Sequence, residues 1–374
     1  MKQSPSSSVV AAVLLFAAGL SVAGGADPPR TLEIGQPAPD FALPGVDGRT
    51  YRLADFDSAQ ILAVVFTCNH CPTAQAYEQR VKKLVADYRD KGVAFVAISP
   101  NDPLALRLDE LGYTDVSDGF EDMKLRAREQ GFDFPYLYDG DRQEVSRRYG
   151  PVATPHLFIF DRARKLRYAG RIDDSEHQDR VTTHDARNAL DALLAGTAVP
   201  VERTRTFGCS VKWSDKRDSV VEAERRWDAE PVALDKIGLD GVRDLVKNAS
   251  DKYLLINVWA TWCGPCVVEF PELVKMHRMY RGRPLELVTI SADGPERSDQ
   301  ALAFLKKQRA SMRNLLFDST DVYALIEALD KEWSGALPHT LLIKPGGEIV
   351  YRATGQLEPL TVRRAIVGQL GRTY

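Results

Sequence analysis

In the first half of the chain, short apolar runs alternate with segments whose apolar residues recur at helical spacing. Ile61 to Thr67 (ILAVVFT) is continuously apolar, which is typical of a strand buried on both faces of a sheet. Cys71 to Tyr88 instead places apolar residues three and four positions apart, which predicts a helix. The other strands predicted in this half span residues 93–99, 156–161 and 166–170, and the other helices span residues 121–130 and 186–194.

The same order of elements returns in the second half. Its predicted strands span residues 254–259, 285–291, 340–343 and 348–352, and its predicted helices span residues 266–280, 300–308 and 360–370. Strands that alternate with helices in this way predict an α/β fold in which each half forms a central mixed sheet flanked by helices.

A chain of 374 residues is long enough for two domains. We expect them to span residues 34–197 and 232–374, with a charged linker over residues 198–231. Basic and acidic residues are balanced between positions 201 and 230, which is typical of a solvated linker or helix face. Alternating apolar residues at positions 207–213 interrupt this charge, and they are also compatible with a strand or with packing on a domain surface.

The first residues have the pattern of a targeting segment. Lys2 is followed by an apolar run from Val9 to Leu20, which is too short to span a bilayer, and then by small residues. We therefore expect a signal peptide over residues 1–26 and export to a periplasmic or other extracytoplasmic compartment; the alternative is an uncleaved anchor. No later stretch approaches 18 apolar residues, so the sequence does not predict an integral membrane protein.

Composition excludes some classes of function. The chain has 49 basic and 52 acidic residues and a net charge of -3, so it lacks the basic excess that attracts nucleic acid. Its five cysteines are too few for a scaffold held together by disulfides at this length. In an oxidising compartment, the spacing of these cysteines therefore becomes the main evidence on function.

Each half has a Cys-x-x-Cys motif directly after its first buried strand: CNHC from Cys68 to Cys71, and CGPC from Cys263 to Cys266. Two cysteines at this spacing at a helix start can close a small disulfide loop. The first thiol then lies near the unpaired N–H groups of the helix, which favour the thiolate that attacks disulfides. The spacing therefore predicts Cys68 and Cys263 as nucleophiles and Cys71 and Cys266 as resolving thiols. Because each pair stores two electrons, we expect no bound organic cofactor.

The sequence LINVWATWCGPC around the second motif resembles the thioredoxin superfamily, and within it the exported TlpA/ResA-like thiol–disulfide oxidoreductases. The resemblance covers about residues 232–374 and includes Glu269 and Pro271 in CVVEFPEL and Pro338 in ALPHTLLI. It implies a thioredoxin-like fold in which Pro338 is a cis-proline beside the disulfide and Leu337 offers backbone groups to a substrate.

Glu269 has two candidate roles. Classical thioredoxins have a buried Asp six residues before the first cysteine, where this chain has Asn257. The resemblance to the TlpA/ResA-like branch implies that Glu269 takes over the proton transfer. The alternative is that Glu269 is a first-turn residue favoured by the helix dipole.

The first half, about residues 34–197, resembles the redoxin/peroxiredoxin-like branch of the same superfamily. The segment GQPAPDFALPGVDGRTYRLADF looks like the opening hairpin of that branch, and VFTCNHCP is similar to a group of exported thioredoxin-like proteins whose reaction is poorly defined. Pro155 in VATPHLFIF is the matching cis-proline candidate. The separation between Cys68 and Pro155 is longer than that between Cys263 and Pro338 in the second half, which predicts an insertion near residues 102–120.

This resemblance leaves a thiol peroxidase as an alternative for the first half. Peroxiredoxins need a Pro-x-x-x-Thr/Ser-x-x-Cys pattern, and neither Cys68 nor Cys71 has a proline seven residues before it. The sequence from Cys71 to Thr73 nevertheless echoes the Cys-Pro-Thr of a peroxidatic site.

A copper-binding or copper-delivery module is a further alternative. Thiols with imidazoles suit Cu(I) or Zn, and Cys68, His70, Cys71 and His156 supply both kinds of ligand, in a pattern related to that of Sco-type copper chaperones. A histidine beside a cis-proline is more typical of a structural residue, and we expect no resident metal.

Two further residues are candidates for adjusting the first centre. A protonated His70 would favour the reduced thiolate and make the first disulfide the more oxidising of the two; the alternative is a loop histidine without a role. Cys209 lies in GCSVKW, which matches a GCSxKW segment found downstream in the CNHC group. It is either a resolving thiol for Cys68 or a buried small apolar residue.

Together these features predict an exported thiol–disulfide oxidoreductase that acts on protein thiols and disulfides. We expect electrons to pass from the Cys263/Cys266 pair to the Cys68/Cys71 pair. The resemblance also makes a membrane electron donor plausible.

Overall fold

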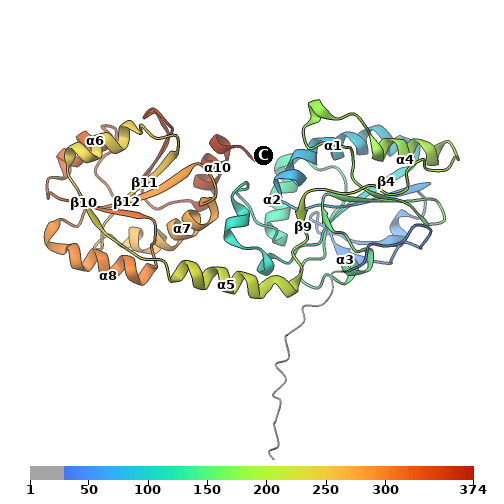
Figure 1. The fold of residues 1–374 in the computed structure, drawn as a ribbon, viewed down its shortest axis with the longest axis horizontal. Helices are drawn as coiled ribbons and strands as arrows, with labels where there is room; N and C mark the ends of the chain where they lie inside the picture. The colour runs from blue at the N-terminus through green and yellow to red at the C-terminus, as the bar shows by residue number, and fades with distance from the viewer. Residues whose placement is uncertain (1–28) are drawn as a thin grey trace, which may run out of the picture.

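The computed structural model describes residues 29–374. Two units, each built on one large sheet, lie side by side, and helix α5 (Arg217–Asp228) runs between them (Figure 1). The predicted signal peptide, residues 1–26, lies outside the described residues. Of the helices within residues 29–374, none is long and apolar enough to cross a bilayer.

The first unit has a five-stranded sheet in the order β5-β4-β3-β7-β8. The central strand β3 (Ile61–Phe66) pairs in parallel with β4 (Val93–Ser99) and antiparallel with β7 (His156–Phe160). The edges are β5 (Tyr136–Tyr138) and β8 (Leu166–Gly170). The sheet is therefore mixed, as predicted.

Neighbouring residues of β3 belong to different apolar clusters. Ala63 packs on the face covered by three helices, whereas Val64 packs on the face covered by a hairpin and one short helix. The helices of the first face are α1 (Pro72–Tyr88), α2 (Phe120–Gln130) and α4 (Asp185–Leu194); the second face has β1 (Ala42–Pro44), β2 (Thr50–Arg52) and α3 (Glu144–Tyr149). Burial on both faces explains why the strand is apolar at every position.

The second unit has a six-stranded mixed sheet in the order β10-β13-β12-β11-β14-β15. Its central strand pairs in parallel with β12 and antiparallel with β14. The strands span β10 Asp235–Ile237, β11 Tyr253–Trp259, β12 Leu285–Ser291, β13 Arg313–Phe317, β14 His339–Ile343 and β15 Ile349–Thr354.

Helices cover both faces of the second sheet as well. One face packs on α7 (Gly264–Tyr280), α8 (Ser298–Gln308) and α10 (Pro359–Leu370), and the other packs on α6 (Leu239–Lys247) and α9 (Val322–Leu329). The predicted α/β class, with a mixed, helix-flanked sheet in each half, is thus confirmed. The sequence pattern did not predict α3, α6, α9 or the short strands β5, β10 and β13.

Part of the predicted charged linker, residues 198–231, is built into the first unit. Strand β9 (Cys209–Ser210) pairs antiparallel with β6 (Ala153–Thr154), and the side chains of Val211 and Trp213 are buried. Part of the apolar stretch at positions 207–213 therefore forms a paired strand, which was one of the alternatives, and this part of the linker is not fully solvated. The domain boundaries themselves remain a prediction.

The insertion predicted near residues 102–120 contacts the second unit. The Tyr280 hydroxyl donates to the carbonyl oxygen of Thr114 at 3.1 Å, and the guanidinium of Arg283 donates to that of Gly112 at 2.8 Å. Asp115, almost fully buried, pairs with Arg364 and with Arg372, at 2.6 Å from the latter. These contacts hold the C-terminal half of α7 and the end of the chain against the first unit.

Candidate functional site

The second centre lies at the N-terminus of α7. Cys263 is the N-cap residue and forms a disulfide with Cys266, whose backbone N–H points to the Cys263 sulfur at 3.3 Å. Cys266 is fully buried, whereas Cys263 retains 6% of its surface and follows Trp262, which is 62% exposed. The centre is therefore reached from solvent through Cys263.

The loop of the second predicted cis-proline adjoins this centre. The Leu337–Pro338 peptide bond is cis, and Leu337 packs against the apolar cluster that contains both cysteines. His339, the next residue, pairs with Val258 of β11. This register places the proline loop next to the strand that leads into the CGPC motif.

Glu269 is buried on the second turn of α7, three residues after Cys266, and is therefore not a first-turn residue. Its carboxylate accepts hydrogen bonds from the Asn257 side chain at 3.0 Å and from the Leu357 backbone N–H at 2.7 Å. Burial raises the pKa of Glu269, and the two hydrogen bonds only partly offset it. A buried carboxylic acid with a raised pKa is suited to carry a proton, and this favours the first of its two candidate roles.

The first centre contains three free thiols from two distant segments. Cys68 and Cys71 are buried, and Cys209, on β9, is half-buried against them. The Cys68 sulfur lies 3.1 Å from the Thr154 hydroxyl, and the Cys71 sulfur lies 3.2 Å from the Thr154 carbonyl oxygen. The Thr154–Pro155 peptide bond is cis, so the first centre also adjoins a cis-proline loop.

Helix α1 begins within one residue of its predicted start, but the expectation that Cys68 lies at the helix N-terminus is wrong. α1 begins at Pro72 and its N-cap is Cys71, whose sulfur accepts from the Ala74 N–H at 3.4 Å. Proline is favoured at the first position of a helix because it has no N–H to satisfy there and its φ suits the helix. Cys71 rather than Cys68 therefore receives the helix N–H groups.

The strand registers independently place Cys71, rather than Cys68, at the position of the first cysteine of the other motif. In the first unit the residue after the cis-proline, His156, pairs with Phe66, and Cys71 follows five residues later. In the second unit, the corresponding pair is His339 and Val258, and five residues after Val258 is Cys263. Cys71 thus matches the first cysteine of the CGPC motif, and Cys68 has no cysteine counterpart there.

A buried ion pair supports the CNHC loop from behind. The Nδ1 atom of His70 lies 2.6 Å from a carboxylate oxygen of Asp118, and Asp118 also accepts from the Asn101 side chain and from the backbone N–H groups of Asn69 and His70. Burial by itself would lower the pKa of His70, but the charge of Asp118 outweighs it and raises the pKa. His70 is therefore a buried residue whose protonated form Asp118 favours, rather than an exposed loop residue.

The two thiols of the CNHC motif differ in acidity. Burial raises the pKa of Cys68 well above its usual range. Burial acts on Cys71 in the same direction, but hydrogen bonds from Cys209 and Cys68 and the charge of His70 outweigh it, so the pKa of Cys71 is well below its usual range. The lowered pKa favours Cys71 over Cys68 as the thiolate of the reduced centre, in agreement with its N-cap position.

His156 does not join the thiols. Its Nδ1 accepts from the Val152 N–H at 3.3 Å, its ring packs on Phe158 at 4.4 Å, and burial lowers its pKa to about 3. Among residues 29–374, the group that could hold a metal ion is instead Cys68, His70 and Asp118. Because His70 and Asp118 already share a short hydrogen bond, a metal would have to replace it.

The sequence profile of the AhpC/TSA family matches residues 34–169 and 239–352, which together make up more than half of the chain. The chain belongs to the AhpC/TSA family. One matched segment lies in each unit, so both mixed sheets carry the family's thioredoxin-like fold.

Named relatives of this AhpC/TSA-family chain match over a limited length. Thiol-disulfide oxidoreductase ResA of Oceanobacillus iheyensis is 31% identical over 107 residues, which are 28% of this chain and 51% of that protein. ResA of Bacillus subtilis is 27% identical over 118 residues, which are 32% of this chain and 62% of that protein. The chain therefore spans between half and two thirds of the length of these curated relatives.

Solved structures match about half of the chain. A hypothetical protein from Sinorhizobium meliloti 1021 is 34% identical with a TM-score of 0.45, covering 50% of this chain and 98% of that one. An uncharacterised conserved protein from Geobacillus kaustophilus is 40% identical with a TM-score of 0.44, covering 50% of this chain and 95% of that one.

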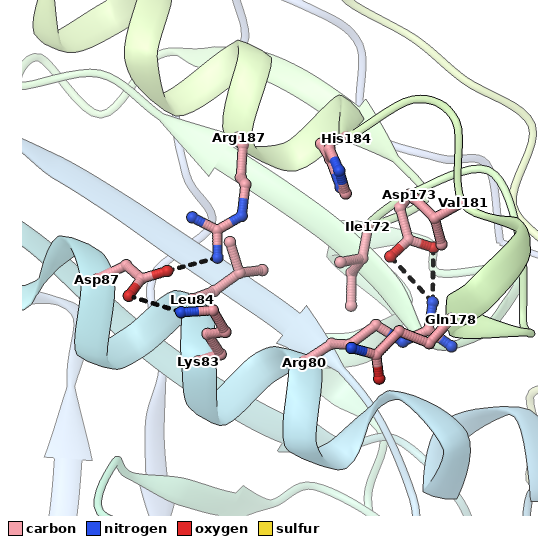
Figure 2. A pocket seen from close by; sticks show the side chains of 10 residues that line it. All are labelled: Arg80, Lys83, Leu84, Asp87, Ile172, Asp173, Gln178, Val181, His184 and Arg187. Carbon is pink, nitrogen blue, oxygen red and sulfur yellow. Dashed lines mark hydrogen bonds and ion pairs between the residues drawn. The ribbon is translucent and has the colours of Figure 1, made fainter.

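A cavity in the first unit of this AhpC/TSA protein lies away from the thiols. It has a volume of about 470 Å³ between α1, α4 and the loop from Ile172 to Val181. Figure 2 shows its charged side chains already paired: Asp87 binds Arg187 and Lys83, and Asp173 binds Arg80. No cysteine lines it, so we do not assign the thiol chemistry to this cavity.

Thr154 and Asp118 are site residues that sequence reasoning missed. Thr154 directly precedes Pro155, and its place in the cis-proline loop was a usable signal. Asp118 lies in the predicted insertion, 48 residues after His70, and no motif in the sequence indicates that the two side chains meet.

Proposed function

We propose that this chain is an exported thiol–disulfide oxidoreductase that acts on protein disulfides and dithiols. The observation that carries the proposal is the Cys263–Cys266 disulfide at the N-terminus of α7, with Cys263 the less buried of the two cysteines and the buried Glu269 one helical turn after Cys266. Export rests on the sequence pattern of residues 1–26. A membrane electron donor is part of the same proposal by family resemblance.

In the reduced second centre, the Cys263 thiolate attacks a sulfur of the substrate disulfide, forms a mixed disulfide and releases one substrate thiolate. Glu269 accepts the proton of Cys266. The Cys266 thiolate then attacks Cys263, which releases the second substrate thiol and restores the enzyme disulfide. The backbone of Leu337, before cis-Pro338, pairs with the substrate chain during the exchange.

The first centre works through Cys71 as nucleophile, with Cys68 as the thiol that closes the disulfide. The protonated form of His70 favours the Cys71 thiolate and hence the reduced state. We therefore retain the predicted direction of electron flow, from the second centre to the first.

Cys263 lies at the N-terminus of α7, whereas Tyr280, whose hydroxyl bonds to the first unit, lies at the other end of the helix, about 25 Å away at 1.5 Å per residue. We propose that electrons pass between two copies of the chain, or after the units separate.

Peroxide reduction at Cys71 is the second candidate function. Two features of Cys71 favour it: the pKa of the thiol is lowered, and the thiol is buried, so that a small molecule can reach it more readily than a protein can. Peroxide consumption that is lost in Cys71→Ser and retained in Cys263→Ser would establish it. Peroxide consumption unchanged in Cys71→Ser would remove it.

Reduction of insulin disulfides with dithiothreitol as electron source tests the main proposal. We expect Cys263→Ser to abolish the activity and Cys68→Ser to leave most of it. An unchanged rate in Cys263→Ser would overturn the assignment.

A further inference from the structure

The strand that carries Cys209 lies where the cis-proline loop of the first unit would receive an extended peptide. β9 pairs antiparallel with β6, and Cys209 is the register partner of Thr154, the residue before cis-Pro155. The Cys209 backbone N–H points to the Cys71 sulfur at 3.3 Å. The chain thus places its own cysteine-bearing strand at the nucleophile.

The residues on both sides of Cys209 fix the position of β9 beside Thr154 and Cys71. A Cβ at Gly208 would lie 2.2 Å from the Thr154 carbonyl oxygen, and φ is +127° there, so glycine is required. After the strand, the Lys212 backbone bonds to Asn101 and Asp102, and its amine pairs with Glu110 at 2.5 Å. The segment is therefore fixed to the first unit.

Burial decides which sulfur an outside protein can reach. Cys71 has no exposed surface and Cys68 only 3%, whereas Cys209 is half-buried. A disulfide between Cys68 and Cys71 would accordingly be less accessible to a protein thiol than one that includes Cys209, which also adjoins Cys71.

We propose that Cys209 is the exchange thiol of the first centre, which takes over the disulfide from Cys68–Cys71 and presents it as Cys71–Cys209 to a protein dithiol. This rests on the proposed thiol–disulfide exchange function and adds the residue through which the first centre meets its partner.

The exchange balances without any further oxidant. Cys209 loses its proton and its thiolate attacks the Cys71 sulfur; the Cys68–Cys71 bond breaks, the Cys71–Cys209 bond forms, and Cys68 takes up a proton. A thiolate of the protein dithiol then attacks Cys209 and expels the Cys71 thiolate, which the Ala74 and Cys209 N–H groups stabilise. The second thiol of the partner releases Cys209, so the partner is oxidised and the first centre gains two electrons.

The test uses the chain with Cys263→Ser and Cys266→Ser, so that only the first centre titrates. The protein is oxidised with diamide and then reduced either by thioredoxin or by dithiothreitol, and mass mapping of alkylated peptides follows each cysteine. With Cys209→Ser added, we expect reduction by thioredoxin to slow by about tenfold or more and reduction by dithiothreitol to change little.

Two variants keep the test decisive. Cys209→Ser with Ser210→Cys keeps the number of thiols but moves one to the other face of β9, and it should not restore the rate. Cys68→Ser should form the Cys71–Cys209 disulfide on oxidation; a Cys209 that stays open to alkylation there would overturn the proposal.

The remaining outcomes separate this inference from the proposed function. Equal reduction by thioredoxin with and without Cys209 would overturn the exchange role and leave thiol–disulfide exchange by the first centre intact. If dithiothreitol reduces the Cys263→Ser, Cys266→Ser protein and thioredoxin does not, both the exchange role of Cys209 and thiol–disulfide exchange by the first centre would be overturned.

Discussion

Cys71 and Cys263 occupy equivalent positions in the two units, each as the N-cap of the helix that follows the central strand and each five residues beyond the partner of the post-proline histidine. The two Cys-x-x-Cys motifs are therefore offset by one helical turn. The second motif extends from this position into its helix, whereas the first extends backwards into the preceding loop. The reactive sulfur is the first cysteine in one centre and the second cysteine in the other.

The His70–Asp118 pair should control the acidity of Cys71. Asp118→Asn removes the charge that favours protonated His70, so we expect the pKa of Cys71 to rise by about one unit, which is a tenfold change in its acid dissociation constant. Thiolate absorbance followed against pH in the Cys263→Ser, Cys266→Ser background measures this change. An unchanged titration would show that His70 does not act on Cys71.

The same pair should contribute stability over a defined pH range. The folded pKa of His70 is raised, so its contribution is complete below its unfolded value of about 6.5 and is lost as the pH rises through the folded value. The folded pKa of Asp118 is lowered, so its contribution is complete above about 3.9 and is lost as the pH falls through the folded value.

We therefore expect Asp118→Asn to lower the free energy of unfolding by about 3 kcal/mol between about pH 4 and 6.5, and by less above this range. Urea unfolding at several pH values measures the difference. In a His70→Asn background the pH dependence of the difference should be much weaker; the same dependence in that background would exclude the pair as its source.

Glu269 should act as the proton carrier of the second centre. Glu269→Gln retains the shape of the side chain but cannot exchange a proton, so we expect insulin reduction to slow by about a hundredfold and the pH–rate profile to lose the limb that Glu269 contributes. Glu272→Gln, on the same helix and only half-buried, is the matched control and should retain the insulin-reduction rate and the full pH–rate profile. An unaltered profile in Glu269→Gln would instead favour a role in helix stability.

Trp262 should provide contact area for protein substrates. It is 62% exposed beside Cys263, and exposed aromatic side chains commonly anchor protein interfaces. We expect Trp262→Ala to raise KM for insulin by about tenfold, with little change in the rate toward a small disulfide. Tyr323→Ala removes an aromatic side chain that is 83% exposed on α9, on the other face of the sheet, and should change neither value.

The sequence predicted the central elements well because their burial leaves a strong pattern. β12 has the predicted bounds, and β3 differs by one residue, since both strands are covered on both faces. The edge strands β5 and β10 have only three residues each, too few to show a period. Short edge strands of this kind depend on pairing with a neighbour, which a local pattern does not contain.

The site was predicted in composition but not in arrangement. The identical spacing of the two motifs suggested identical roles, whereas Pro72 decides where α1 begins and so which thiol lies at the helix N-terminus. The contact of Cys209 with Cys71 depends on β9 returning across 138 residues of chain, and that of Asp118 with His70 on the fold of the insertion. Contacts of this range are set by tertiary structure.

The reduction potential of each centre, measured in the mature protein by redox-buffer titration and mass mapping of alkylated cysteines, tests the central claim of two distinct two-electron thiol centres. We predict two separate transitions, with the first centre the more oxidising; a gap of about 60 mV would favour electron flow from the second centre to the first by about a hundredfold. Coincident or reversed potentials would contradict the predicted flow. Failure of the CNHC thiols to form any disulfide would contradict the existence of a second centre.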